Sequence, residues 1–173
     1  ELRQKGRADE AVRLIVDGPP LAARPFDTSL WVTELLALAR AASTRDAVRI
    51  AARANDAFAP GEDISSGPFR LRDDYTSLMW LGGTNALWRL GDGNAAAPLF
   101  QRYGAAARTP QTRSKGYFWE GEAARRAGNG AAAQAAFVRA SAYPDRFYGQ
   151  MALARLGQPL PPLPATPEIA ISE

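Results

Sequence analysis

Apolar residues recur three and four positions apart along most of the chain, which is the spacing of one helix face. In the first such segment, residues 8–17, the apolar side chains include Ala11, Val12 and Ile15, and Gly18-Pro19-Pro20 ends the pattern. The same spacing predicts further helices over residues 29–42, 44–58, 73–90, 94–107, 111–127, 130–142 and 144–156. The pattern therefore predicts an all-α fold.

Two segments interrupt this pattern. Residues 60–72 are rich in Gly, Pro, Ser and Asp, and a loop this long in a helical array is usually an insertion on one face or a mobile segment, so we expect a mobile loop here. Residues 158–173 begin with a run of prolines, which cannot continue a helix and favour extended geometry. We expect one helical domain over residues 1–157, and a Pro-rich linker over 158–173 that leads to a further domain downstream.

A four-residue phrase repeats with an offset of 37 residues, as Leu90-Gly91-Asp92-Gly93 and Ala127-Gly128-Asn129-Gly130. Each copy is followed by alanines and then by a phenylalanine, Phe100 or Phe137, and a fainter copy runs over Gly6–Ile15. A glycine at a helix end supplies the left-handed conformation that lets the next helix fold back. We expect both phenylalanines to be buried between helices. The offset is close to that of tetratricopeptide-like helix pairs, which stack into an α-superhelix, or solenoid.

The composition limits the kinds of catalytic, metal-binding and cofactor site that the chain can form. The chain has 35 alanines but only ten valines and isoleucines, which favours helices over a sheet. It has no Cys and no His, which excludes thiol nucleophiles, Ser-His triads, disulfides and zinc sites built from Cys and His. The sequence also contains no phosphate-binding GxxxxGK[ST] or GxGxxG motif, so we expect no cofactor.

The charge pattern is that of an ordinary surface. There are 21 basic and 18 acidic residues, a net charge of +3, and 19 of the basic residues are scattered arginines. Nucleic-acid binding needs clustered cations, so we expect no nucleic-acid partner. No stretch approaches the roughly 20 apolar residues of a membrane span, so no transmembrane segment is expected either.

Acidic and aromatic residues supply the candidate chemistry. Glycoside cleavage uses two facing carboxylates, but Glu120 and Glu122 lie two apart on a helix and face about 200° apart. We therefore expect both to be solvated surface carboxylates. Tyr117, Phe118 and Trp119 are three rings in a row, which either pack between helix pairs or form a stacking platform for a sugar or base.

Several phrases containing aromatic and small residues follow one another in a characteristic order. They are Asp27-Thr28-Ser29-Leu30-Trp31, Trp80-Leu81-Gly82-Gly83, the run from Tyr117 to Ala124, Ala142-Tyr143-Pro144, and Phe147-Tyr148-Gly149-Gln150 followed by Leu156-Gly157. Over about residues 26–164, their order and spacing resemble the superhelical part of soluble lytic murein transglycosylases.

This resemblance implies a large α-superhelix that carries a lysozyme-like catalytic domain in the periplasm. The family cleaves the bond between N-acetylmuramic acid and N-acetylglucosamine in peptidoglycan, forming a 1,6-anhydro sugar. Its catalytic residue is a glutamate followed by serine, and none of the eight glutamates here is followed by serine. The resemblance therefore implies a non-catalytic scaffold whose partners are glycan strands and its own downstream catalytic domain. The alternative is a tetratricopeptide-like module that binds a protein or peptide.

Contacts to glycan are expected on helices 111–127 and 144–156. Both come first in their pairs by the repeat alignment, which places them on the same wall. They carry a mixture of cations and aromatics that suits sugar rings and the carboxylates of muramic acid and stem peptides. The candidate residues are Arg113, Lys115, Tyr117, Trp119, Arg146 and Tyr148. The alternative for each ring is packing between helices.

Overall fold

The structure is a computed structural model that describes residue 3 and residues 5–162, and this part of the chain is all-helical. Its α-helices are α1 (Ala8–Asp17), α2 (Thr28–Ala41), α3 (Thr44–Arg53), α4 (Phe69–Thr84), α5 (Gly93–Ala106), α6 (Pro110–Arg126), α7 (Gly130–Ser141) and α8 (Phe147–Arg155). Short 3₁₀ turns occur at η1 (Ala54–Ala57) and η2 (Ile64–Ser66), and a π-helical turn, η3 (Asn85–Arg89), continues α4. The predicted all-α fold is confirmed.

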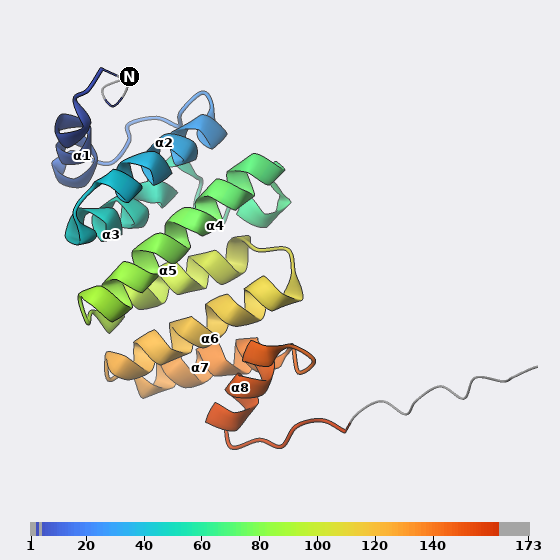
Figure 1. The fold of residues 1–173 in the computed structure, drawn as a ribbon. Coiled ribbons are helices and arrows are strands. Elements are labelled where there is room, and N and C mark those ends of the chain that lie inside the picture. Colours follow the sequence, from blue (N-terminus) through green and yellow to red (C-terminus); the bar gives the residue numbers. More distant parts are fainter. Residues whose placement is uncertain (1–2, 4, 163–173) are drawn as a thin grey trace, which may run out of the picture.

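The helices follow one another in chain order from α1 at one end of the molecule to α8 at the other (Figure 1). Each helix packs against the next one in the chain. Helices also contact the next but one, so that α2 lies against α4, α6 against α8, α1 against α3, and α3 against α5. The fold is therefore built from neighbours in the sequence.

Short polar side chains cap five of the eight α-helices described, which are α2, α3, α5, α6 and α7. Asp27 accepts a hydrogen bond from the backbone N–H of Leu30 at 2.9 Å, and Ser43 accepts one from the N–H of Asp46 at 3.2 Å. The repeated phrase does the same in both copies, because Asp92 caps α5 and Asn129 caps α7.

The 37-residue repeat has the same packing in both copies. A Cβ placed on Gly83 of α4 would lie 2.7 Å from the ring of Phe100, and one placed on Gly121 of α6 would lie 2.5 Å from the ring of Phe137. Each phenylalanine thus rests directly on the backbone of the preceding helix, where only glycine leaves room. Phe100 is 0% exposed and Phe137 is 4% exposed, which confirms that both are buried.

The fainter N-terminal copy has the same backbone feature. Gly91 and Gly128 have left-handed φ angles of 70° and 79° and lie two residues before α5 and α7. Gly6 has a φ of 74° and lies two residues before α1. By this alignment α1 corresponds to α5 and α7, and Ile15, which is only half-buried, corresponds to Phe100 and Phe137.

Two helix starts differ from the prediction. Helix α4 begins at Phe69, inside the segment expected to be a loop, because Gly67 and Pro68 precede the helix rather than interrupt it. Within residues 60–68, Asp63 caps η2 and Glu62 receives two hydrogen bonds from Arg24, at 2.8 and 3.0 Å.

Helix α8 begins later than expected, at Phe147 instead of residue 144. Residues 144–146 form a turn closed by the N–H of Arg146 and the carbonyl of Tyr143, at 3.0 Å. Of the predicted linker, residues 158–162 are exposed and have no regular structure, and residues 163–173 lie outside the described residues.

Candidate functional site

Five of the six residues expected to contact glycan lie on α6 and α8, which pack against each other, and Arg146 lies in the turn just before α8. Those on α6 point to two different sides of the helix. Lys115 and Trp119 face α4 and η3: the Lys115 Nζ atom lies 3.5 Å from the centre of the Trp80 ring, and the rings of Trp119 and Trp88 are 5.0 Å apart. Burial lowers the pKa of Lys115.

Arg113 and Tyr117 lie on another side of α6. The Arg113 Nε atom donates to the carbonyl of Ala107 at 2.8 Å, and the Arg139 guanidinium of α7 lies 5.4 Å from the centre of the Tyr117 ring. Positions two apart on a helix point about 200° apart, so residues 117 and 119 cannot share one face.

The two candidates at the start of α8 also have different surroundings. The half-buried ring of Tyr148 packs 5.5 Å from Phe118 of α6. Arg146 is exposed and pairs with its neighbour Asp145 at 3.1 Å. The structure therefore brings Lys115 and Trp119 together, but it does not join the six residues into one surface.

Tryptophan rings from η3 and α6 form one wall of an open cleft of about 340 Å³. The indole of Trp88 is 51% exposed and meets Trp119 edge to face. The residues that line the cleft are Leu87, Trp88, Trp119, Glu122, Arg125 and Arg126. Of the six predicted residues, Trp119 lines this cleft.

Glu122 is the acidic group of the cleft, and two arginines hold it. Its carboxylate accepts hydrogen bonds from Arg155 at 2.6 Å and from Arg125 at 2.9 Å. Burial acts to raise the pKa of Glu122, but these hydrogen bonds and positive charges outweigh it and lower the pKa below its usual range. Glu122 therefore stays ionised and does not have the raised pKa of a general acid.

The expectation that Glu120 and Glu122 are solvated surface carboxylates is wrong. Their side chains are only 14% and 11% exposed, because neighbouring helices cover both sides of α6. Glu120 turns to α7, where Arg139 donates to it at 2.7 Å, and burial raises its pKa. The two carboxylates thus have separate partners and form no acid–base pair.

The cleft combines groups that recognise polar rings and acids. The exposed face of Trp88 can stack on a sugar ring, and the exposed guanidinium groups of Arg125 and Arg126 can bind carboxylates. The buried Trp119 Nε1 atom has no hydrogen-bond partner among the residues that the structure describes. The arrangement is suited to binding.

Sequence reasoning missed Trp88, Arg125 and Arg126, although the repeat contains a signal for Trp88. With the 37-residue offset, Trp88 corresponds to Arg125, which is a polar position in the second copy. A tryptophan at a position that its own repeat fills with arginine is expected to be exposed.

The chain matches no protein-family model, and no curated protein or solved structure is significantly similar to it. Across residues 3 and 5–162, no group of three or more acidic side chains is arranged to hold a metal ion. None of the helices described is long and apolar enough to span a membrane.

Proposed function

We propose that the chain is a scaffold of tetratricopeptide-like helix pairs that stack into a superhelix. The observation that carries this proposal is the glycine–phenylalanine contact, which recurs between α4 and α5 and between α6 and α7. Stacked pairs of this kind form quasi-one-dimensional arrays whose surfaces bind other molecules.

We further propose that this scaffold belongs to a periplasmic lytic transglycosylase that cleaves peptidoglycan glycan strands. The support is the resemblance to soluble lytic murein transglycosylases, whose phrases fall largely on α4 to α8. In this proposal the chemistry takes place in a lysozyme-like domain downstream of the Pro-rich segment, and the chain itself is not catalytic.

The scaffold's direct contribution is then to hold glycan in the cleft beside Trp88. A ring that is half exposed and backed by other rings is a rigid stacking surface, and the cations next to it suit the acidic groups of stem peptides. Trp119 supports Trp88 from behind, while Arg113, Lys115, Tyr117, Arg146 and Tyr148 lie outside the lining of the cleft.

Co-sedimentation with purified peptidoglycan sacculi tests the binding role. We expect the chain to pellet with the sacculi, and the Trp88→Ala and Arg126→Ala variants to remain mostly in the supernatant. Phe69→Ala is a matched control, because Phe69 is 72% exposed on α4 and lies outside the cleft. Equal pelleting of all four proteins, or of none, would remove the cleft from the proposal.

Muropeptide analysis of the same reactions tests the non-catalytic role. We expect the chain to release no anhydro-muropeptides, because the family's catalytic Glu-Ser pair is absent from the sequence. Release of these products by the chain alone would contradict the assignment of the chemistry to another domain.

A second candidate function, a module that binds protein, is favoured by a different observation. An apolar groove larger than the Trp88 cleft lies between α1 and α2, with a volume of about 460 Å³. Exposed apolar surfaces of this kind commonly mark protein-binding sites. Alanine substitutions in the groove and, separately, in the cleft would distinguish protein binding from glycan binding. The two surfaces share no residue, so each set of substitutions affects one surface alone.

A further inference from the structure

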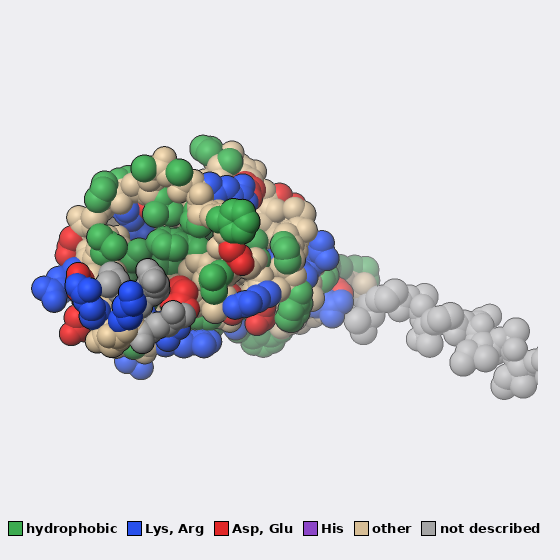
Figure 2. Space-filling view, turned by 90° about the horizontal axis from the view of Figure 1, so that it is seen from above, with side chains coloured by type: hydrophobic (Ala, Val, Ile, Leu, Met, Phe, Trp, Pro, Cys, Tyr) green, Lys and Arg blue, Asp and Glu red, His purple; other side chains and the backbone are tan. Residues whose placement is uncertain are grey.

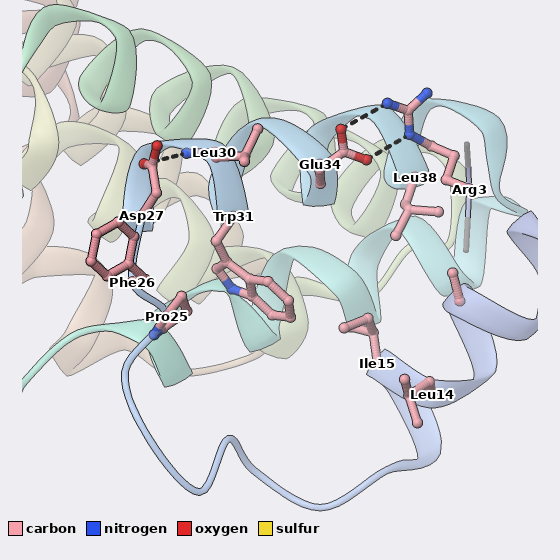
Figure 3. A pocket seen from close by; sticks show the side chains of 11 residues that line it. Arg3, Leu14, Ile15, Pro25, Phe26, Asp27, Leu30, Trp31, Glu34 and Leu38 are labelled. Atoms are coloured by element: carbon pink, nitrogen blue, oxygen red, sulfur yellow. Dashed lines mark hydrogen bonds and ion pairs between the residues drawn. The ribbon is translucent and has the colours of Figure 1, made fainter. Parts of the chain in front are cut away.

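Most arginines of this chain are held by groups of the protein itself. Seen from the end formed by α1 and α2, charged side chains of both signs lie around an apolar centre (Figure 2). Arg3 at this end shows the usual arrangement, because its guanidinium donates two hydrogen bonds of 2.8 Å to the carboxylate of Glu34 (Figure 3). Among the described residues, four of the 19 arginines have no hydrogen-bond, ion-pair or ring partner. They are Arg40, Arg45, Arg89 and Arg126, and all four are exposed.

The fold brings these four arginines to one edge of the molecule, although they are scattered in the sequence. They flank the turns that join α2 to α3, η3 to α5, and α6 to α7, and these turns follow one another along the same edge (left in Figure 1). The first two turns are adjacent because α3 contacts η3. At the second and third turns, the Arg126 Nη2 atom lies 3.7 Å from the place of a Cβ on Gly91. The four arginines therefore form one row along the edge.

One arginine recurs at the same position of each turn. Arg40, Arg89 and Arg126 each lie three residues before the N-cap of the following helix. Those N-caps are Ser43, Asp92 and Asn129. The row thus presents one guanidinium for each helix pair, and Arg45 adds a fourth at the start of α3.

The helix dipole accounts for part of this pattern. A cation in the last turn of a helix is stabilised by the partial negative charge there, which applies to Arg40, Arg89 and Arg126. It does not apply to Arg45, which lies in the first turn of α3, where the same dipole disfavours a positive charge. The dipole therefore leaves both Arg45 and the lack of carboxylate partners unexplained.

The acidic groups near this edge have other partners. Asp92 caps α5, while Asp46 accepts a hydrogen bond of 2.8 Å from the Ser43 hydroxyl and lies 3.8 Å from Arg49. The carboxylate of Glu122 already holds two other arginines. The positive charge of the row is therefore not paired within the described part of the chain.

The row continues the cleft beside Trp88. Arg126 belongs to the lining of that cleft, and Arg89 directly follows Trp88 in η3. A ligand held against the exposed indole therefore meets the row at its middle turn.

We propose that the row binds the carboxylates of the stem peptides on a glycan strand, and that the strand runs along this edge from the Trp88 cleft to the turn between α2 and α3. This inference rests on the proposed binding of glycan in the cleft, and it adds that the ligand must carry negative charge.

The chemistry of the row fits such a ligand. A guanidinium binds a carboxylate through two parallel hydrogen bonds, as Arg3 binds Glu34 within the chain. A strand that carries one acidic peptide after another along its length suits an edge that presents one arginine after another.

Co-sedimentation with two kinds of sacculi tests this inference on the full 173-residue chain. One kind is intact, and in the other the carboxyl groups have been converted to amides with a carbodiimide in excess ammonia. We expect the wild type to bind the amidated sacculi at least roughly tenfold more weakly, because hydrogen bonds to charged groups are lost. Its binding to intact sacculi should also weaken as salt is added, since salt screens exposed charges.

A double variant separates the row from the cleft. Arg40→Gln with Arg45→Gln changes two residues outside the cleft lining, so it should bind intact sacculi roughly tenfold more weakly and amidated sacculi like the wild type. Arg70→Gln is the matched control, because Arg70 is a 62% exposed arginine in the first turn of α4, and it should change neither. All three sites are exposed, so the fold should persist, which circular dichroism will check.

The outcomes distinguish this inference from the proposed function. Equal binding of the wild type to both kinds of sacculi would overturn the inference, as would a double variant that binds intact sacculi like the wild type. Loss of binding by Trp88→Ala would still support the cleft in either case. A wild type that binds neither kind of sacculi would remove both proposals. Release of the bound chain by an equal mass of single-stranded oligonucleotide would identify the row as a phosphate-binding surface and would also overturn the inference.

Discussion

The connection between α5 and α6 and the connection between α1 and α2 occupy equivalent places in the fold, yet they pack differently. Helices α5 and α6 touch backbone to backbone, because a Cβ on Gly116 would lie 2.5 Å from the Cα atom of Gly104. Helices α1 and α2 contact each other sparsely and leave the open apolar groove between them. Comparison of the two connections shows which features let two successive helices of this chain pack closely.

One difference lies at a single position. Gly116 is seven residues after Thr109, the N-cap of α6, and the residue seven after Asp27, the N-cap of α2, is Glu34. A carboxylate has to keep its hydration or find a partner, so it cannot be pressed against a neighbouring backbone as glycine can. Glu34 pairs with Arg3 instead.

A second difference lies in the connecting segments. Only residues 107–109 join α5 to α6, whereas residues 18–27 join α1 to α2 and contain three prolines. A short connection holds its two helices side by side, while a longer one permits them to separate. The open groove therefore results both from the long connection over residues 18–27 and from Glu34, which stands where α6 has Gly116.

The largest expected effect is a loss of stability at one repeat position, which is buried at Phe137 and half-buried at Ile15. Phe137→Ala should destabilise the fold by roughly 3–5 kcal/mol, because the ring is buried against Gly121 and its removal leaves a cavity. Ile15→Ala, at the equivalent position in the open groove, should cost less than about 2 kcal/mol. Urea unfolding followed by circular dichroism measures both. Equal losses would mean that the N-terminal copy of the repeat is as tightly packed as the others.

A smaller effect is expected from opening the tight connection. Gly116→Ala should destabilise the fold by about 1–3 kcal/mol, since its Cβ would overlap the backbone of Gly104 and force α5 and α6 apart. Gly130→Ala is the matched control, because a Cβ at Gly130 has no atom within 4 Å. The same unfolding assay should show little change for the control. A neutral Gly116→Ala would contradict the account of close backbone packing given above.

The smallest effect concerns the ion pair at the groove. Hydrogen bonding to Arg3 lowers the pKa of Glu34, so carbon-13 NMR should show its carboxyl titrating below the ordinary value of about 4.3. A carboxyl with a lowered pKa stabilises the fold above its ordinary pKa, and this contribution is lost as the pH falls through the lowered one. Arg3→Gln should return the titration toward the ordinary range. An unshifted Glu34 in the wild type would contradict the pairing.

Periodicity and turn chemistry predicted most of the fold. The bounds of α1 agree with the prediction, and those of α6 and α7 lie within one residue of it. The buried phenylalanines also follow from the repeat. These features depend on local backbone preferences and on one recurring contact, both of which are visible in a single sequence.

The site was harder to predict because it depends on the angular position of each residue on its helix. Residues of α6 that are close in the sequence face different neighbours, and an aromatic ring pattern does not indicate which ring is left exposed. The start of α4 differs from the prediction for a related reason: Gly67-Pro68 favours a loop locally, but the helix that follows is held by buried side chains from Leu71 onward.

Among the described helices, each one packs against helices one or two places along the chain, so folding mainly joins segments that are near neighbours in the order of elements. Chains dominated by local contacts pay little loop-closure entropy before their contacts form, and they fold on the microsecond to millisecond timescale. Structure can then start in any tight pair and spread to its neighbours. We expect the glycine-packed region from α4 to α7 to form first in this chain, and α1, with its sparse contacts to α2, to dock last and open first.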